Sequence, residues 1–283
     1  MATATRERPV LQSGVTLLSA FLLGAGGLVF GATLTFAVAR LLIVATGINL
    51  TPSRLLVVGL ITIQGIAFPA VAFAYVKLRP VLSPKIREVL SLPAVRKQFS
   101  IEFSVPNLRE VGVVVLGYVG AMGGLVVASV LITTLVSVFG VEPGSNQAAE
   151  IGMENPGVLL LLIPASFVLI GPGEELLFRG VVQGRLRELF GPIAGVGIAS
   201  VFFAAIHFFA LTGGSVAGNL VALIALLIPS LILGVAYEYT GNLVVPSLIH
   251  GAYNATLFTG LYVVVKYSDQ LSSSAAFSHV GWL

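Results

Sequence analysis

The sequence predicts an all-α, polytopic membrane protein, a bundle of about seven to eight transmembrane helices. Of its 283 residues, 57% are hydrophobic and only 10% are charged, and the mean hydropathy is +1.02. Soluble domains carry about a quarter of their residues as charges, so a chain this poor in charge cannot cover a water-facing surface. Apolar runs of the roughly 20 residues that a spanning helix needs recur along the chain. We therefore expect an integral membrane protein, surrounded by lipid and located in the cell membrane.

Seven apolar runs are candidates for spanning helices. The first is about twice as long as the apolar core of a typical signal peptide, so it is expected to be a retained span. The runs are Val15 to Ala39 (with an extension to Thr46), Leu55 to Val76, Val111 to Phe139, Val158 to Phe178, Ile193 to Ala210, Leu220 to Tyr237 and Leu243 to Val265.

Basic residues predict that the N-terminus is cytoplasmic, because loops rich in lysine and arginine stay inside. The opposite side would receive Arg54, Lys266 and an acidic loop with Glu142, Glu150 and Glu154. The net charge of +3 reflects this bias, and no basic tract indicates a nucleic-acid partner. The residues assigned to the cytoplasmic side are Arg6, Arg8, Lys77, Arg79, Lys85, Arg87, Arg96, Lys97, Arg109, Arg185 and Arg187.

The chain divides into a generic N-terminal half and a chemically richer C-terminal half. Residues 1–110 are expected to form N-terminal transmembrane helices with a basic, amphipathic cytoplasmic segment, residues 111–267 a catalytic core, and residues 268–283 a polar tail. The segment from Lys77 to Glu110 is either a helix on the inner membrane surface or a structured cytoplasmic loop. Two GxxxG spacings, Gly27 to Gly31 and Gly120 to Gly124, are candidates for close helix contacts.

Ionisable residues inside spanning segments are costly and therefore indicate function. Three stretches of the C-terminal half carry them, and spacing orders the side chains within each stretch. Residues four apart share a helix face, which makes an ion pair of the Glu–Arg pair in the first stretch and aligns the His and Asn of the third. The candidates are Glu174, Glu175 and Arg179 in the first stretch, His207 in the second, and His250 with Asn254 in the third.

Counting residues along the helices predicts that these groups lie at one depth in the membrane. Glu175 and His207 are equally far in sequence from the Phe190-Gly191-Pro192 turn, so two antiparallel helices joined there would place them at the same level. His250 lies about two turns into the last helix, counted from the turn at 240–242. The two glutamates and two histidines are therefore expected to meet roughly 10 Å below the inner surface, at a rise of about 1.5 Å per residue. Phe203, one turn from His207, would pack against the site.

The residue inventory excludes several membrane chemistries. With no cysteine, a thiol nucleophile, a disulfide framework and a Cys-ligated zinc site are all ruled out. An aspartyl protease needs two aspartates, whereas the chain has Asp269 alone, and the zinc-binding string HExxH is absent. Ser215 falls in a loop on the side opposite His250, which argues against a serine protease.

A Glu/His site that cleaves a peptide bond remains, and it can work in two ways. In one, Zn²⁺ bound by Glu174, His207 and His250 activates water. In the other, Glu174 with His207 polarises the water directly as general base. In that metal-free case His250 and Asn254 would donate hydrogen bonds to the developing oxyanion. The residues leave both routes open.

Three ordered motifs resemble those of the CPBP family of intramembrane proteases, which includes the type II CAAX prenyl endopeptidases and Abi-type immunity proteins. They are Glu-Glu-x-x-x-Arg at Glu174 to Arg179, Phe-x-x-x-His at Phe203 to His207, and His-x-x-x-Asn at His250 to Asn254. The resemblance covers roughly 111–266. It implies about eight spans, so that the first long run would hide a break, and an intramembrane cavity open to the cytoplasm.

By the same resemblance, Glu174 and His207 would activate the water, His250 and Asn254 would hold the oxyanion, and Glu175 with Arg179 would support the site. The expected function is that of an intramembrane (metallo)endopeptidase of the CAAX-protease type. Its substrate would be a membrane-associated peptide or protein, prenylated or not. Two alternatives stay open, namely a non-catalytic Abi-type immunity or scaffold protein, and a proton-coupled transporter of small solutes.

Overall fold

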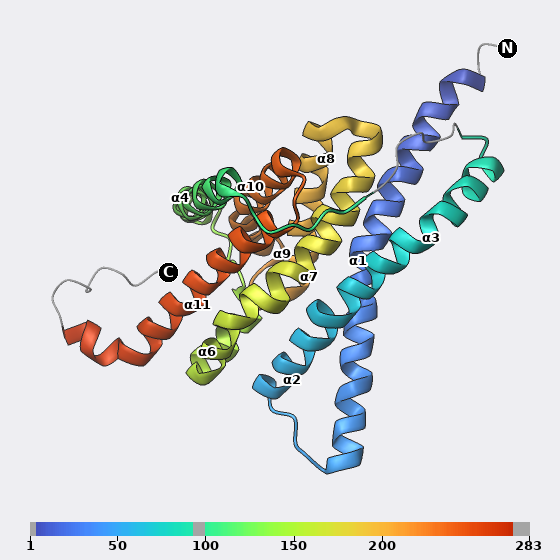
Figure 1. Cartoon of the computed structure of the whole chain (residues 1–283). Coiled ribbons are helices and arrows are strands. Elements are labelled where there is room, and N and C mark those ends of the chain that lie inside the picture. The colour runs from blue at the N-terminus through green and yellow to red at the C-terminus, as the bar shows by residue number, and fades with distance from the viewer. Residues whose placement is uncertain (1–3, 93–99, 274–283) are drawn as a thin grey trace.

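The computed structural model describes residues 4–92 and 100–273 and is a bundle of helices (Figure 1). Besides the helices it contains one short antiparallel pair, β1 (Ser145–Asn146) with β2 (Leu211–Thr212). The helices are α1 (Ala4–Thr46), α2 (Pro52–Gly59), η1 (Leu60–Ala67), α3 (Phe68–Val89), α4 (Leu108–Phe139), α5 (Gln147–Glu154), α6 (Pro156–Ala165), η2 (Ser166–Ile170), α7 (Gly171–Glu175), η3 (Leu176–Gln183), α8 (Gly184–Ile206), η4 (His207–Ala210), α9 (Val216–Ala222), α10 (Ile224–Thr240) and α11 (Val244–Ser273).

Six helical stretches of the described residues are long and apolar enough to cross a membrane. One of them, Pro156–Ala210, has 55 residues, far more than one crossing of a hydrocarbon core about 30 Å thick needs. Gly191, with φ of 78°, reverses the chain inside it, as the α8 ribbon shows (Figure 1). Two of the predicted spans therefore lie in this stretch, and the all-α polytopic fold is confirmed.

The break expected in the first long run is absent, because α1 is one continuous helix from Ala4 to Thr46. The segment after Lys77 also differs from the surface-helix interpretation. Helix α3 continues without interruption to Val89, so the basic residues up to there extend a spanning helix. Residues 93–99 and 274–283 of the predicted cytoplasmic segment and polar tail lie outside the described residues, and α11 occupies the start of that tail.

Helix α6, η2, α7 and η3 follow one another as a continuous rod with π-helical turns at η2 and η3. Pro164 and Pro172 lie in this rod, and each lacks the N–H that an α-helical hydrogen bond requires. The π-helical turns of η2 and η3 follow the two prolines, as is usual where the regular ladder is interrupted. η1 is a third π-helical segment, and it precedes α3 without a turn.

The core of the bundle is centred on η3, all eight residues of which are buried. Leu177, Phe178 and Val181 have no exposed surface and pack with residues of α1, α3 and α8. Large apolar side chains on α1 and α4 point outward instead, among them Phe36, 69% exposed, and Leu116, 74% exposed. Exposed apolar side chains of this size are expected where the surrounding solvent is lipid.

Both GxxxG spacings lie at close helix contacts, as predicted. A Cβ atom added at Gly27 would come within 2.8 Å of Leu177 on η3, and one at Gly31 within 3.1 Å of the backbone of Ile63 on η1. On the other side of the bundle, a Cβ atom at Gly124 of α4 would lie 2.5 Å from Ile228 of α10. Glycine therefore permits α1 and α4 to approach the helices that carry the polar residues.

Candidate active site

Glu174, Glu175 and Arg179 lie at the centre of the bundle, where α7 passes into η3. Glu175 and Arg179 have no exposed surface, and Glu174 is 6% exposed. Close backbone packing sets this position. A Cβ atom at Gly171 would lie 2.7 Å from the carbonyl oxygen of Ser247, and one at Gly251 would lie 2.7 Å from Phe167. These two glycines let the α6–η3 rod lie directly against α11, which carries His250.

Glu175 and Arg179 together connect their own helical rod to α10 and α11. Its Oε2 atom is 3.0 Å from Nε of Arg179, and its Oε1 atom is 2.8 Å from Nδ1 of His250. The guanidinium of Arg179 also donates to the hydroxyl of Ser230 on α10, at 3.1 Å. The predicted Glu–Arg pair is thus present, and it extends to His250 and Ser230.

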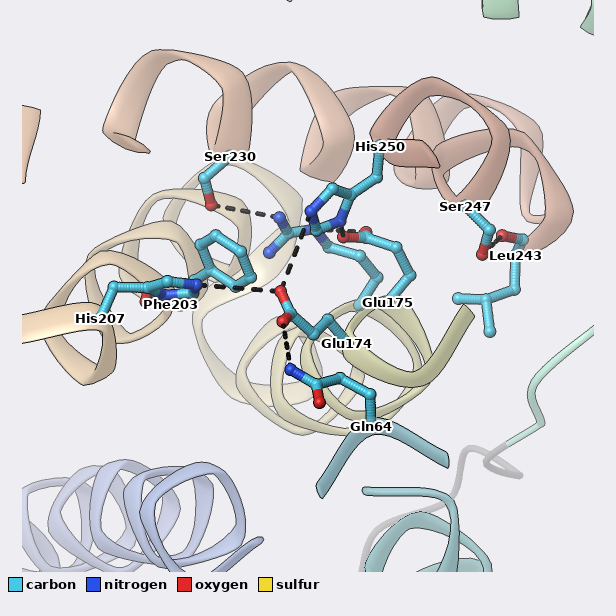
Figure 2. A network of polar contacts seen from close by, with 10 residues as sticks. Gln64, Glu174, Glu175, Phe203, His207, Ser230, Leu243, Ser247 and His250 are labelled. Atoms are coloured by element: carbon cyan, nitrogen blue, oxygen red, sulfur yellow. Dashed lines mark hydrogen bonds and ion pairs between the residues drawn. The ribbon is translucent and has the colours of Figure 1, made fainter. Parts of the chain in front are cut away.

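Glu174, the residue before Glu175, points between the two histidines (Figure 2). Its Oε2 atom is 3.9 Å from Nε2 of His207 and 3.9 Å from Nε2 of His250. Its Oε1 atom accepts a hydrogen bond from Nε2 of Gln64 on η1, at 3.4 Å. The structure therefore brings Glu174, His207 and His250 together, as the depth argument predicted.

Hydrogen bonds determine which ring nitrogen each histidine presents. Nδ1 of His207 is 2.7 Å from the carbonyl oxygen of Phe203, and Nδ1 of His250 contacts the carboxylate of Glu175. Both partners can only accept, so both Nδ1 atoms carry the proton and donate. The Nε2 atoms of the two rings are consequently left to face Glu174.

Phe203 packs against the site as predicted. Its ring centroid is 4.5 Å from that of His207 and 6.0 Å from that of His250. The guanidinium carbon of Arg179 lies 5.0 Å from the Phe203 ring, a cation–π distance. One aromatic ring therefore contacts both histidines and the buried cation.

Asn254 lies one turn beyond His250 on α11 and is half-buried. Its side chain makes no hydrogen bond to the residues that the structure describes. The sequence placed it on the face of His250, and its role as a hydrogen-bond donor stays a prediction. Ser215, considered for a serine mechanism, instead caps α9, where its hydroxyl accepts from the N–H of Gly218 at 3.0 Å.

Sequence reasoning missed Gln64 and Ser230, although both contact the predicted residues. Each is a polar residue inside an apolar span, and Ser230 is fully buried. Gln64 lies in the apolar run ITIQGIAF. A polar amide within a spanning segment was the one sequence feature that could have marked it as a candidate site residue. No spacing rule connects it to Glu174, because the two residues are 110 positions apart.

The donor set of Glu174, His207 and His250 has the chemistry of a zinc site, but its spacing is too wide. Ligand atoms around a tetrahedral Zn²⁺ lie roughly 3.3 Å from one another, given bonds of about 2.0–2.1 Å. The two Nε2–Oε2 separations of 3.9 Å exceed this value, and the described part of the chain holds no group of three His, Asp or Glu side chains arranged for a metal. The three side chains as they lie therefore do not fit a bound Zn²⁺, and metal binding stays a prediction.

Fold and site define a polytopic α-helical membrane protein with a buried Glu/His cluster. Residues 156–256, which hold the rod, both histidines and Asn254, match the family model described as type II CAAX prenyl endopeptidase Rce1-like. This match confirms the resemblance that the three motifs indicated.

A second comparison finds the uncharacterized protein YpbD of Bacillus subtilis (strain 168). It is 39% identical over 83 residues, which are 29% of this chain and 36% of that protein. The chain thus spans about a third of the length of this relative. No solved structure matches the chain.

Proposed function

We propose that the protein is an intramembrane endopeptidase that hydrolyses a peptide bond with a water molecule activated by Glu174. The observation that supports this proposal best is the position of Glu174 Oε2, 3.9 Å from Nε2 of both histidines. This separation is too long for a direct hydrogen bond and suits a bridging water. The CPBP-type segment supports the same reaction class.

Glu174 would act as the general base. A water between the carboxylate and the histidines gives its proton to Oε2, while its oxygen attacks the carbonyl carbon of the substrate. Nε2 of His207, which carries no proton in the neutral ring, accepts a hydrogen bond from the remaining O–H of the water and so orients the lone pair of its oxygen. When the tetrahedral intermediate collapses, Glu174 gives the proton to the leaving amine nitrogen. General base catalysis requires a base within hydrogen-bond reach of the proton that it removes, and a water in this position would meet that requirement.

His250 and Asn254 would stabilise the oxyanion of the tetrahedral intermediate. The cluster holds two carboxylates and one guanidinium, so an imidazolium at His250 would balance its charge. In that state Nε2 of His250 donates to the oxyanion, while Glu175 holds the other ring nitrogen at 2.8 Å. Asn254, free of other described partners, would supply a second donor from the same helix face.

The substrate we propose is a membrane-associated protein or peptide. The matching family model is described as a prenyl endopeptidase of the CAAX type, which favours a substrate with a lipidated C-terminus. A lipid-embedded substrate would reach Glu174 from within the bundle, through the cavity that the family resemblance predicts.

The test is cleavage of a quenched fluorescent library of lipidated and unlipidated peptides by the purified protein. Glu174→Gln should lower kcat by roughly 100-fold or more, since a general base contributes about 10²–10⁴-fold. Glu238→Gln is the matched control, because Glu238 pairs with Arg187 near the surface and not with the site; it should cleave like the wild type.

Cleavage that survives in Glu174→Gln contradicts the role of this residue. If no variant cleaves and Glu174→Gln keeps the cellular phenotype, the scaffold or immunity function is favoured, whereas pH-driven uptake into liposomes favours a transporter. Dialysis against a metal chelator should leave cleavage intact. A loss that Zn²⁺ restores would establish the metal route instead.

A further inference from the structure

Gln64 contacts the site from the N-terminal helices, outside the family-matched residues 156–256. It lies in the π-helical segment η1, and Figure 2 shows it approaching Glu174 from the side opposite His250. The contact between η1 and α7 is a backbone contact. A Cβ atom added at Gly173 would collide with the carbonyl oxygen of Gln64 and come within 3.2 Å of its Cα atom. The glycine next to Glu174 therefore fixes the position of Gln64.

The orientation of the Gln64 amide follows from charge. An ionised carboxylate can only accept hydrogen bonds, so the amide must present its NH₂ group to Oε1 of Glu174, at 3.4 Å. The amide oxygen is then buried, and it has no hydrogen-bond partner among the described residues. A buried acceptor without a partner is unfavourable, and the bond from the NH₂ group to a charged acceptor is the interaction that offsets this cost.

Because of this bond, the two carboxylate oxygens of Glu174 have different neighbours. Oε1 is held by Gln64, whereas Oε2 stays directed at the two histidine Nε2 atoms. A glutamate side chain has three rotatable bonds. That of Glu174 makes no other direct hydrogen bond to the described residues. Without Gln64 the carboxylate could rotate away from the position between the histidines.

We propose that Gln64 is a positioning residue, which orients the carboxylate of Glu174 toward the attacking water and makes the N-terminal helices part of the active site. The inference rests on the proposed function, in which Glu174 is the general base. Gln64 acts only through Glu174, so it is expected to affect the chemical step and to leave substrate binding unchanged.

Two variants and one control test the proposal in the purified full-length protein. Gln64→Met keeps the length of the side chain and removes the NH₂ donor, and Gln64→Glu keeps its shape and places a second acceptor against Glu174. Thr62→Val is the matched control, because Thr62 is a buried polar residue of the same segment. Its hydroxyl donates to the carbonyl oxygen of Val58 on α2 and is hydrogen-bonded to the hydroxyl of Thr35 on α1.

Two measurements, kinetics and infrared spectroscopy, decide whether Gln64 positions Glu174. Loss of a hydrogen bond to a charged group should lower kcat about 10- to 100-fold at unchanged KM in Gln64→Met, and further in Gln64→Glu. The carboxylate stretching band of Glu174 in the infrared, assigned as the band missing from Glu174→Gln, should shift in both Gln64 variants. Thr62→Val should change neither.

A Gln64→Met protein with wild-type kcat, or with an unshifted Glu174 band, overturns the proposal. A fall in kcat that Thr62→Val reproduces overturns it as well, since it would reflect damage to η1. If the wild type cleaves no peptide, the proposed function fails, and the infrared band alone then decides whether Gln64 holds Glu174.

Discussion

At the scale of single residues, the charges of the site are held by partners on different helices. Glu175 binds Arg179 on its own rod and His250 on α11, and Arg179 reaches Ser230 on α10. Both members of the Glu175–Arg179 pair are fully buried. Removal of one partner would leave the other charged in a medium that cannot solvate it, whereas the intact pair is tolerated.

Arg179→Met should therefore destabilise the protein strongly, by about 3–5 kcal/mol, the usual cost of breaking a buried ion pair. Arg179→Lys should restore little of this, because an ammonium cannot reach Glu175 and Ser230 together or stack on Phe203 in the same way. Thermal unfolding in detergent measures the effect. Arg187→Met, at a pair whose arginine is 38% exposed, is the control and should change stability little. Equal stability of the two variants would contradict the structural role of Arg179.

At the scale of elements, glycines decide how closely helices approach. On α4, Gly123 and Gly124 are neighbours in sequence with opposite surroundings. A Cβ atom at Gly124 would lie 2.5 Å from Ile228 on α10, whereas one at Gly123 would meet no atom within 4 Å. The close contact with α4 therefore supports α10, whose Ser230 accepts a hydrogen bond from Arg179.

Gly124→Val should thus destabilise the protein by about 1–3 kcal/mol, the cost of overpacking a close contact. Gly123→Val has the same chemistry in open space and should leave the unfolding temperature near that of the wild type. Thermal unfolding of the two purified variants tests this pair. Equal unfolding temperatures would show that α4 and α10 do not meet at Gly124.

At the scale of the whole molecule, basic residues predict which end of the bundle faces the cytoplasm. Lys85 extends α3 beyond its apolar part, and Asn49 lies in the connection between α1 and α2 at the other end. Both residues are exposed. The positive-inside rule places Lys85 in the cytoplasm and Asn49 outside.

The absence of cysteine makes this orientation simple to test with single-cysteine variants. Asn49→Cys should react with a membrane-impermeant maleimide on intact cells, whereas Lys85→Cys should react only after the cells are permeabilised. The unmodified chain is a control without any thiol. The reverse labelling pattern would place the N-terminus outside and contradict the prediction.

The sequence by itself determined the membrane class, the helical fold and the common depth of the two glutamates and the two histidines. Length and apolarity of a spanning helix are local properties, and the depths of Glu175, His207 and His250 follow from counting residues at a fixed rise. The reversal at Gly191 was also readable, since a glycine and a proline stand there together. The same motifs predicted the family-model match of residues 156–256.

Only the tertiary structure decided which side chain contacts which. Counting residues gives depth but not the rotation of each helix about its axis, and the π-helical turns in η1, η2 and η3 change that rotation where Gln64, Glu174 and Arg179 lie. The bond from Gln64 to Glu174, the bond from His250 to Glu175 and the reach of Arg179 to Ser230 all join residues more than 50 positions apart. Such contacts depend on how the helices pack, which no local pattern in the sequence encodes.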